Sequence, residues 1–259
     1  MKRNRDSKVK ELVILASATL ALVAPPAHAC TIFVLTDARH TLFCNNEDWP
    51  DPSAQIWFHP AQNGSYGAAY VGFDNGRPQG GLNTEGLAYD WVMNEVPRKW
   101  ESDLPSPRGY SCLRMLETCK TVKDAIAFYR TYAEPSFSTA SILVADKTGA
   151  SVIIGFKDGH IEVEESKQSR GFGFGGRGRL ASALADRASL VPPAEPTVEE
   201  GYTILYDCRQ AGRYATNYSN IFDLKSGDIF LRVLRERTVE VKVNLAVELK
   251  KGEHFYEMA

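Results

Sequence analysis

Two neighbouring stretches decide the fold of this chain: Cys30-Thr31-Ile32-Phe33-Val34-Leu35 and Thr41-Leu42-Phe43-Cys44-Asn45-Asn46-Glu47-Asp48-Trp49. Residues 31–35 and 41–44 are runs of β-branched and apolar side chains, and residues 37–40 separate them. This pattern predicts a β-hairpin with Cys30 at the start of its first strand. The polar residues 45–48 that follow predict either a turn or a functional site.

The segment before Cys30 has the three parts of a secretory signal peptide. Residues 1–10 carry five basic side chains, residues 12–23 are an unbroken run of apolar and small residues, and Ala27-His28-Ala29 follows as a cleavage site. The apolar run is too short to span a bilayer. We therefore expect residues 1–29 to be removed, and residues 30–259 to form a single exported domain, periplasmic or secreted.

Cleavage after Ala29 would make Cys30 the first residue of the mature chain. An N-terminal cysteine carries a thiol, with an ordinary pKa of about 8.5, beside a free α-amine with an ordinary pKa of about 7.7 to 8.0. The amine can therefore accept the thiol proton near neutral pH, and one residue supplies both nucleophile and base. An alternative is lipoprotein acylation of Cys30, but Ala27 and His28 do not fit the usual aliphatic and small residues before such a cysteine.

The other cysteines have a structural interpretation. Five cysteines in an exported chain leave one unpaired. If Cys30 is the free one, the remaining four can form two disulfides in any of three connectivities, and these four are Cys44, Cys112, Cys119 and Cys208.

Composition excludes several classes of function. The chain has 259 residues, of which 44% are hydrophobic and 24% charged, a balance typical of globular proteins. A formal net charge of −2 gives no indication of nucleic-acid binding. No cysteine or histidine spacing resembles a metal-ligand set, so we expect no metal and no cofactor.

One glycine-rich segment gives a competing signal. Gly173, Gly175 and Gly178 fit the spacing of a dinucleotide-binding fingerprint. That fingerprint requires a buried strand before it, whereas residues 161–170 are highly charged. We therefore favour a mobile loop beside the substrate entrance.

Periodicity along the rest of the chain indicates a mixed α+β domain. We expect helices over residues 110–120, 121–132, 180–190 and 198–210. We expect strands over residues 139–145, 152–156, 160–164, 216–223, 228–234 and 238–248.

Three segments, in this order, resemble the linear amide C–N hydrolases, the family of choloylglycine (bile salt) hydrolase and penicillin V acylase. They are residues 30–49, residues 80–88 and residues 218–230. Members of this family are N-terminal-nucleophile (Ntn) hydrolases. The resemblance implies a four-layer αββα sandwich of two stacked antiparallel sheets, and a cysteine amidase that acts through a thioester.

The resemblance also implies roles for individual residues. Cys30 matches the nucleophile, and Asp48 matches the aspartate that holds the α-amine. Asn45 stands where the family has an arginine, which predicts a less depressed thiol pKa and a more neutral pocket. Asn94, one residue beyond the ungapped position, is the candidate oxyanion-hole donor. Arg187 is the nearest match to an arginine in a later helix, and the family's later asparagine has no clear counterpart.

The sequence thus predicts an exported amidase for a small-molecule N-acyl amide, with no nucleic-acid partner and no membrane span after cleavage. Acyl transfer at the same site and a catalytically inactive binding protein, soluble or lipid-anchored, are the alternatives, and a homo-oligomer is compatible with the sequence. Aromatic residues near the opening motifs indicate an apolar or aromatic acyl pocket or ordinary core packing: Trp49, Trp57, Phe58, Tyr66, Tyr89 and Trp91.

Overall fold

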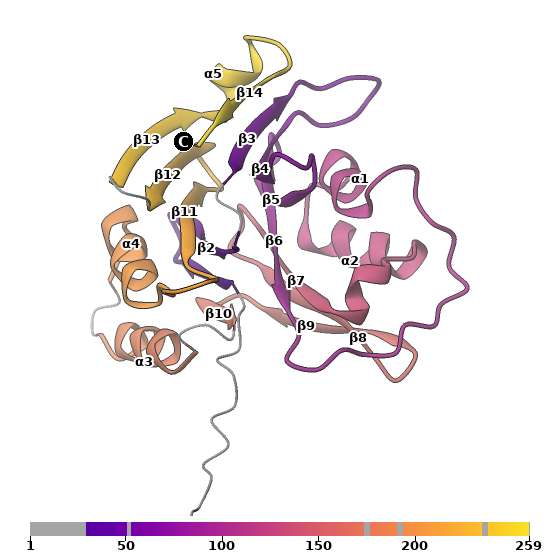
Figure 1. Ribbon diagram of the computed structural model, residues 1–259, viewed down its shortest axis with the longest axis horizontal. Helices are drawn as coiled ribbons and strands as arrows, with labels where there is room; N and C mark the ends of the chain where they lie inside the picture. Colours follow the sequence, from indigo (N-terminus) through magenta and orange to yellow (C-terminus); the bar gives the residue numbers. More distant parts are fainter. Residues whose placement is uncertain (1–29, 51–52, 174–176, 191–193, 235–237, 259) are drawn as a thin grey trace, which may run out of the picture.

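Two antiparallel sheets, stacked face to face, form the centre of the molecule (Figure 1). The computed structural model describes residues 30–50, 53–173, 177–190, 194–234 and 238–258. The predicted signal peptide, residues 1–29, lies outside the described residues. No helix within the described ranges is long and apolar enough to cross a membrane.

The first sheet has six strands, and the predicted hairpin lies in its interior. Its strands are, in spatial order, β10 (Arg170–Gly173), β1 (Thr31–Thr36), β2 (Thr41–Asp48), β11 (Thr216–Asp223), β12 (Asp228–Leu234) and β13 (Thr238–Asn244). The predicted hairpin is confirmed, and Thr31 pairs with Asn46 across it. Since β10 and β11 flank the hairpin on both sides, neither of its strands is an edge strand.

The second sheet has eight strands. Their spatial order is β14 (His254–Glu257), β3 (Ala54–His59), β4 (Ala68–Phe73), β5 (Pro78–Asn83), β6 (Leu87–Met93), β7 (Ala140–Asp146), β8 (Ser151–Lys157) and β9 (His160–Ser166).

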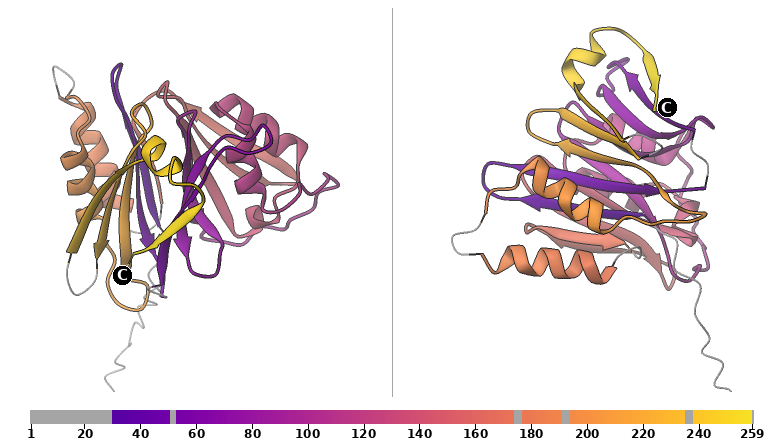
Figure 2. Two further views of the ribbon diagram at one scale, coloured as in Figure 1. Left: turned by 90° about the horizontal axis from the view of Figure 1, so that it is seen from above. Right: turned by 60° about the vertical axis from the view of Figure 1, so that its left-hand side comes forward.

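Helices cover the outer faces of both sheets (Figure 2). Helices α1 (Ser111–Thr118) and α2 (Val122–Thr131) pack on the eight-stranded sheet, and α3 (Arg177–Ala188) and α4 (Val198–Asp207) on the six-stranded sheet. A short 3-10 helix, η1 (Pro135–Ser138), precedes β7, and α5 (Leu245–Leu249) joins β13 to β14. The predicted αββα sandwich is confirmed.

Three hydrophobic cores follow from this layering, one between the sheets and one beneath each helix pair. Alternate residues of a strand point to opposite faces. On β2, Phe43 therefore enters the core between the sheets, whereas Cys44 enters the core beneath α3 and α4. Every residue of β2 is buried, and Leu42, Phe43 and Cys44 in its first half pack into hydrophobic cores on both faces of the sheet.

The structure decides one open alternative and corrects two local expectations. Residues 45–48 form the end of β2 and not a turn, because β1 and β11 pair with them on both sides, which leaves the alternative of a functional site. Residues 170–173 form β10 and not a loop, while residues 174–176 lie outside the described residues. The last predicted strand ends at Asn244, because Leu245 turns into the core between the sheets and begins α5.

The five cysteines are all free in this structure, so none of the three disulfide connectivities is formed. Cys44, Cys112, Cys119 and Cys208 are buried, and each packs as an apolar residue in one of the two cores beneath the helices.

Candidate active site

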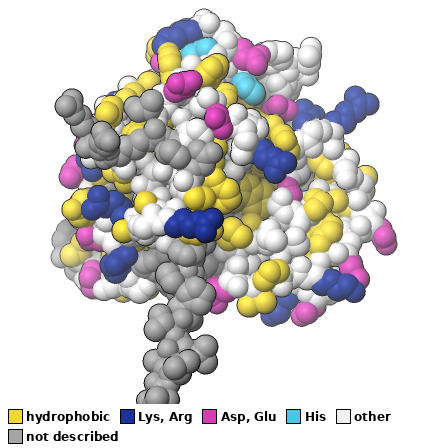
Figure 3. Space-filling view, in the orientation of Figure 1, with side chains coloured by type: hydrophobic (Ala, Val, Ile, Leu, Met, Phe, Trp, Pro, Cys, Tyr) yellow, Lys and Arg dark blue, Asp and Glu magenta, His cyan; other side chains and the backbone are white. Residues whose placement is uncertain are grey.

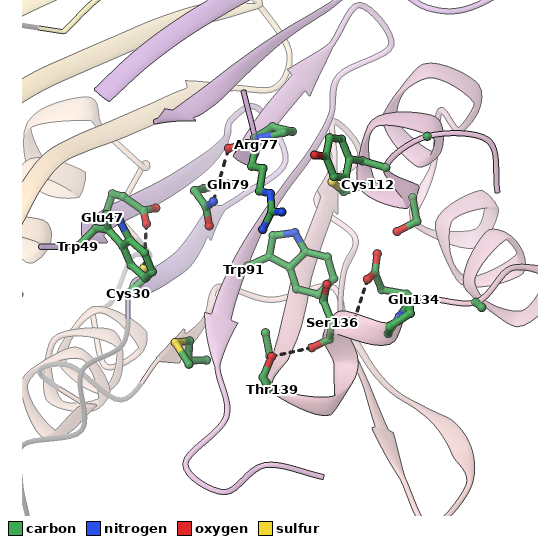
Figure 4. A pocket seen from close by; sticks show the side chains of 18 of the residues that line it. Cys30, Glu47, Trp49, Arg77, Gln79, Trp91, Cys112, Glu134, Ser136 and Thr139 are labelled. Carbon is green, nitrogen blue, oxygen red and sulfur yellow. Dashed lines mark hydrogen bonds between the residues drawn. The ribbon is translucent and has the colours of Figure 1, made fainter. Parts of the chain in front are cut away.

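Cys30 lies immediately before β1 and lines a cavity of about 590 Å³ (Figure 4). The cavity lies between the end of the hairpin and the loops around α1 and η1. Figure 3 shows hydrophobic side chains gathered around a hollow near the middle of this face of the molecule. The lining residues used below are Cys30, Glu47, Asp48, Trp49, Arg77 and Trp91.

A glycine positions the backbone of the cysteine. Gly173 of β10 pairs with Thr31 and has φ of +156°. A Cβ at Gly173 would lie only 2.6 Å from the carbonyl oxygen of Cys30. The close approach of β10 to the start of β1 therefore requires glycine here.

The carboxyl group beside the thiol belongs to Glu47. The Sγ of Cys30 donates a hydrogen bond to Oε1 of Glu47 over 3.5 Å, as the dashed line in Figure 4 marks. Burial, with the carboxylates of Glu47, Asp48 and Asp90, raises the pKa of the Cys30 thiol well above its ordinary value. These surroundings therefore favour the protonated form of the Cys30 thiol.

Asp48 is fixed from the far end of the chain. Gln210 donates from Nε2 to Asp48 Oδ2 over 2.6 Å, and the Thr216 hydroxyl donates to Oδ1. Burial raises the pKa of Asp48 to about 7, although these two hydrogen bonds act in the opposite direction. Its carboxylate acts on Cys30 electrostatically and lines the same cavity, so the structure brings together the two residues that the sequence placed at the reaction centre.

A third carboxyl group, that of Asp90, reaches the site from the other sheet. Asp90 of β6 is fully buried, and its Oδ1 accepts a hydrogen bond from the backbone N–H of Trp91 over 2.7 Å. A Cβ on Gly80 would collide with this carboxyl group, so Gly80 makes the room that it occupies. Asp90 acts on Glu47 and on Cys30, although it comes from a different layer of the fold.

Asn45 is beside this cluster but does not line the cavity. It is fully buried on β2, and its Nδ2 donates to Oδ1 of Asn220 over 3.3 Å. It also hydrogen-bonds with Glu47, which lowers the pKa of that carboxyl group. Asn45 therefore affects the pKa of Glu47, and it does not contribute to the lining of the cavity.

The other two candidates from the sequence are elsewhere. Asn94 lines a different pocket, where its Oδ1 accepts from Ser141 over 2.8 Å and its Nδ2 donates to the carbonyl of Phe137. Asn94 is therefore absent from the lining of the Cys30 cavity, and its role as the oxyanion-hole donor stays a prediction. Arg187 pairs with Glu200 and donates to the carbonyl of Ala194 over 2.6 Å, so it ties α3 to α4 and does not line the cavity.

Sequence reasoning missed Glu47 and Asp90. Alternation along the hairpin could have found Glu47, since Asn45 pairs with Ile32 and the next residue on the same face is Glu47, beside Cys30. No local signal marks Asp90, because its position depends on how the second sheet stacks on the first.

The walls of the cavity are largely apolar. Of the aromatic residues near the opening motifs, Trp49 and Trp91 line the cavity, whereas Phe58 and Tyr89 belong to hydrophobic cores. The exposed Arg77 extends over the cavity toward Trp91 and gives its mouth a cation (Figure 4). Within the described part of the chain, no group of three or more histidine, cysteine or acidic side chains could hold a metal ion.

Comparison with known proteins gives a match in structure alone. No protein-family model matches the chain, and no curated protein matches its sequence. A conjugated bile acid hydrolase variant from Clostridium perfringens superposes with a TM-score of 0.67 at 15% identity, over 88% of this chain and 96% of that one. Penicillin V acylase from Agrobacterium tumefaciens superposes with a TM-score of 0.62 at 12% identity, over 84% of this chain and 86% of that one. This chain has the Ntn-hydrolase fold.

A third solved structure with the Ntn-hydrolase fold is the Caenorhabditis elegans ortholog of N-acylethanolamine-hydrolyzing acid amidase. It matches with a TM-score of 0.55 at 12% identity, over 75% of this chain and 92% of that one. The three neighbours are a bile acid hydrolase, a penicillin acylase and an acid amidase. The resemblance read from the sequence is therefore confirmed for the fold.

Proposed function

We propose that this chain is an exported cysteine amidase that hydrolyses a linear, non-peptide C–N bond of an N-acyl substrate. One observation carries the proposal: Cys30 lies before the first strand and lines a largely apolar cavity, in a fold shared with amide hydrolases. Removal of residues 1–29 by a signal peptidase would free the α-amine of Cys30.

The reaction proceeds by covalent catalysis. The Cys30 sulfur attacks the amide carbonyl carbon, and the tetrahedral intermediate expels the amine to leave a thioester. Water then attacks the thioester and releases the acid. The freed α-amine takes part in the proton transfers, and the Asp48 carboxylate stabilises its ammonium form.

The cavity favours an apolar acyl group. Trp49 and Trp91 offer aromatic surface near the thiol, and Tyr110, Pro107 and Pro135 extend the apolar lining toward the loops. Burying such surface against an acyl chain supplies binding free energy without a cofactor.

A test begins with the N-terminus of the protein recovered after export. Mass spectrometry should find a chain that starts at an unmodified Cys30. This material is then assayed against conjugated bile acids, penicillin V and N-acylethanolamines, with Cys30→Ala as the matched control. Hydrolysis by wild type that Cys30→Ala abolishes supports the proposal. An acylated Cys30, or equal hydrolysis by both proteins, contradicts it.

A further inference from the structure

The cluster around the thiol is acidic, and its members come from both sheets. Glu47 shares its face of β2 with Phe43, so its side chain points between the sheets, and the Asp90 carboxyl group of β6 faces the same space and raises the pKa of Glu47. The groups that act on Glu47 are the carboxyl groups of Asp90 and Asp48, the Cys30 thiol and the Asn45 amide. Tyr218 of β11 faces the same cluster.

The two facing carboxyl groups retain a proton near neutral pH. Burial raises the pKa of Asp90 to about 8, and burial together with Asp90 raises the pKa of Glu47. Two buried carboxylates side by side repel each other, so the pair ionises in steps. Glu47 receives hydrogen bonds from Cys30 and Asn45, which favour its ionised form, whereas Asp90 receives one from the Trp91 backbone.

An α-amine on Cys30 would lie in the same acidic surroundings. Nearby carboxylates stabilise the ammonium form of an amine, which makes it a weaker proton acceptor and a better proton donor at neutral pH. Asn45 stands where a family arginine would oppose this effect. The amine alone is therefore poorly suited to deprotonate the thiol, whereas the Glu47 carboxylate already accepts its hydrogen bond.

We propose that acid and base roles are divided at this site: Glu47 accepts the thiol proton of Cys30, the α-ammonium protonates the leaving amine, and Asp90 is a positioning residue for Glu47. This inference rests on the proposed amidase function. It adds a second proton-transfer group to the reaction, supplied by a residue that the sequence resemblance does not assign.

The proton balance closes over one turnover. Sulfur bonds to the carbonyl carbon while its proton passes to Glu47, and the C–N bond breaks as the α-ammonium gives a proton to the leaving nitrogen. The neutral α-amine then removes a proton from the water that attacks the thioester. When the C–S bond breaks, Glu47 returns its proton to the sulfur, and both groups regain their starting states.

The principal test compares two rates in Glu47→Gln. Removing the negative charge beside the thiol should lower the thiol pKa, and a fall of about one pKa unit gives about tenfold more thiolate below that pKa. Iodoacetamide should therefore alkylate Cys30 faster at pH 7, measured by mass spectrometry of the N-terminal peptide. Amidase kcat should nevertheless fall by about a hundredfold, because the proton acceptor is lost.

Faster alkylation together with a lower kcat distinguishes a proton acceptor at Glu47 from a residue with a structural role alone. Loss of both rates would mean that Glu47 only shapes the site, and a rise or no change in kcat would mean that thiolate supply alone matters. Either result overturns the proposal. Glu47→Asp keeps the carboxylate and should retain more turnover than Glu47→Gln. Glu240→Gln, at a surface ion pair on β13, is the control for the substitution itself.

Asp90→Asn tests the positioning role through the pH profile. Without the facing carboxyl group Glu47 ionises more easily, so the acid limb of kcat/KM should move to lower pH. An unmoved limb contradicts the pairing. Absence of amidase activity in wild type would instead count against the proposed function, and the alkylation measurement, which needs no substrate, keeps the two failures distinct.

Discussion

Thr216 donates its hydroxyl hydrogen bond to the carboxylate of Asp48, a residue 168 positions earlier in the sequence. Asp48 ends β2, and Thr216 begins β11, which pairs with it. Gln210 holds the second carboxylate oxygen from the loop before β11. The orientation of Asp48 therefore depends on pairing between the first and the last third of the chain.

Asp48→Asn should reduce turnover by about a hundredfold or more, because it removes the charge that stabilises the ammonium on Cys30. Folding should be retained, since an amide of the same shape replaces a buried carboxyl group. Steady-state kinetics and thermal melting measure the two effects. Thr216→Val leaves the carboxylate in place but removes one hydrogen-bond donor, so it should reduce turnover by a smaller factor. Unchanged kinetics in Asp48→Asn would leave Asp48 with a structural role alone.

A chain that keeps Ala29 before Cys30 should have no amidase activity. The peptide bond converts the α-amine into an amide that neither accepts nor donates the required proton. An uncleavable Ala29-Cys30 fusion, compared with the same protein released by a protease, measures this directly. Full activity of the stable fusion would exclude any role for the amine.

The protein should be less stable at pH 8.5 than at pH 5.5. Burial raises the pKa of Asp48 to about 7 and that of Asp90 to about 8, while unfolded aspartates titrate near 3.9. The native state therefore binds more protons than the unfolded state in this window, and the free energy of unfolding falls as pH rises through the native pKa values. Thermal melting at constant ionic strength should show a lower Tm at pH 8.5, and Asp90→Asn should reduce the difference. A higher Tm at pH 8.5 would contradict the predicted loss of stability with rising pH.

Arg77→Gln should change selectivity between anionic and neutral amides. The guanidinium at the cavity mouth can pair with a substrate carboxylate, and a charge-assisted hydrogen bond contributes about 1.5–3 kcal/mol, roughly tenfold or more in binding. The ratio of kcat/KM for an anionic over a neutral amide should fall by that factor. Arg130→Gln, on the exposed side of α2, is the control. An unaltered ratio would mean that Arg77 does not contact the substrate.

Asn45 stands where the family resemblance has an arginine, and from the sequence this predicts a more neutral pocket. The structure buries Asn45 against Asn220 and Glu47, away from the cavity lining. Arginine at this position would place its charge beside the Glu47 and Asp90 pair, so its effect should appear in the pH profile before it appears in substrate preference.

The local pattern of apolar, turn and capping residues was enough to predict the hairpin and the four longer helices. Each depends on residues that are neighbours in sequence, such as the Thr121 and Asp124 capping box at the start of α2. The pairing of β10 with β1 depends on residues about 140 positions apart, for which composition gives no signal.

The candidate site divides in the same way. Cys30 and Asp48 follow from motif and position, whereas Asp90 required the stacking of two sheets. The choice of Asn94 depended on a one-residue shift in the alignment with the family motif. Met93 is the last residue of β6, and a shift of one residue along a strand reverses the face that a side chain occupies.

The interior position of the hairpin in the six-stranded sheet has a consequence for the order of folding. Strands β1 and β2 are synthesised first, but their outer partners β10 and β11 lie at residues 170–173 and 216–223. Until those residues emerge, both hydrogen-bonding edges of the hairpin are open to other chains. A chain that stops before Thr216 should therefore aggregate rather than accumulate as a partly active form. Cys30 is among the first residues of the domain to be made, and its surroundings are among the last to be completed.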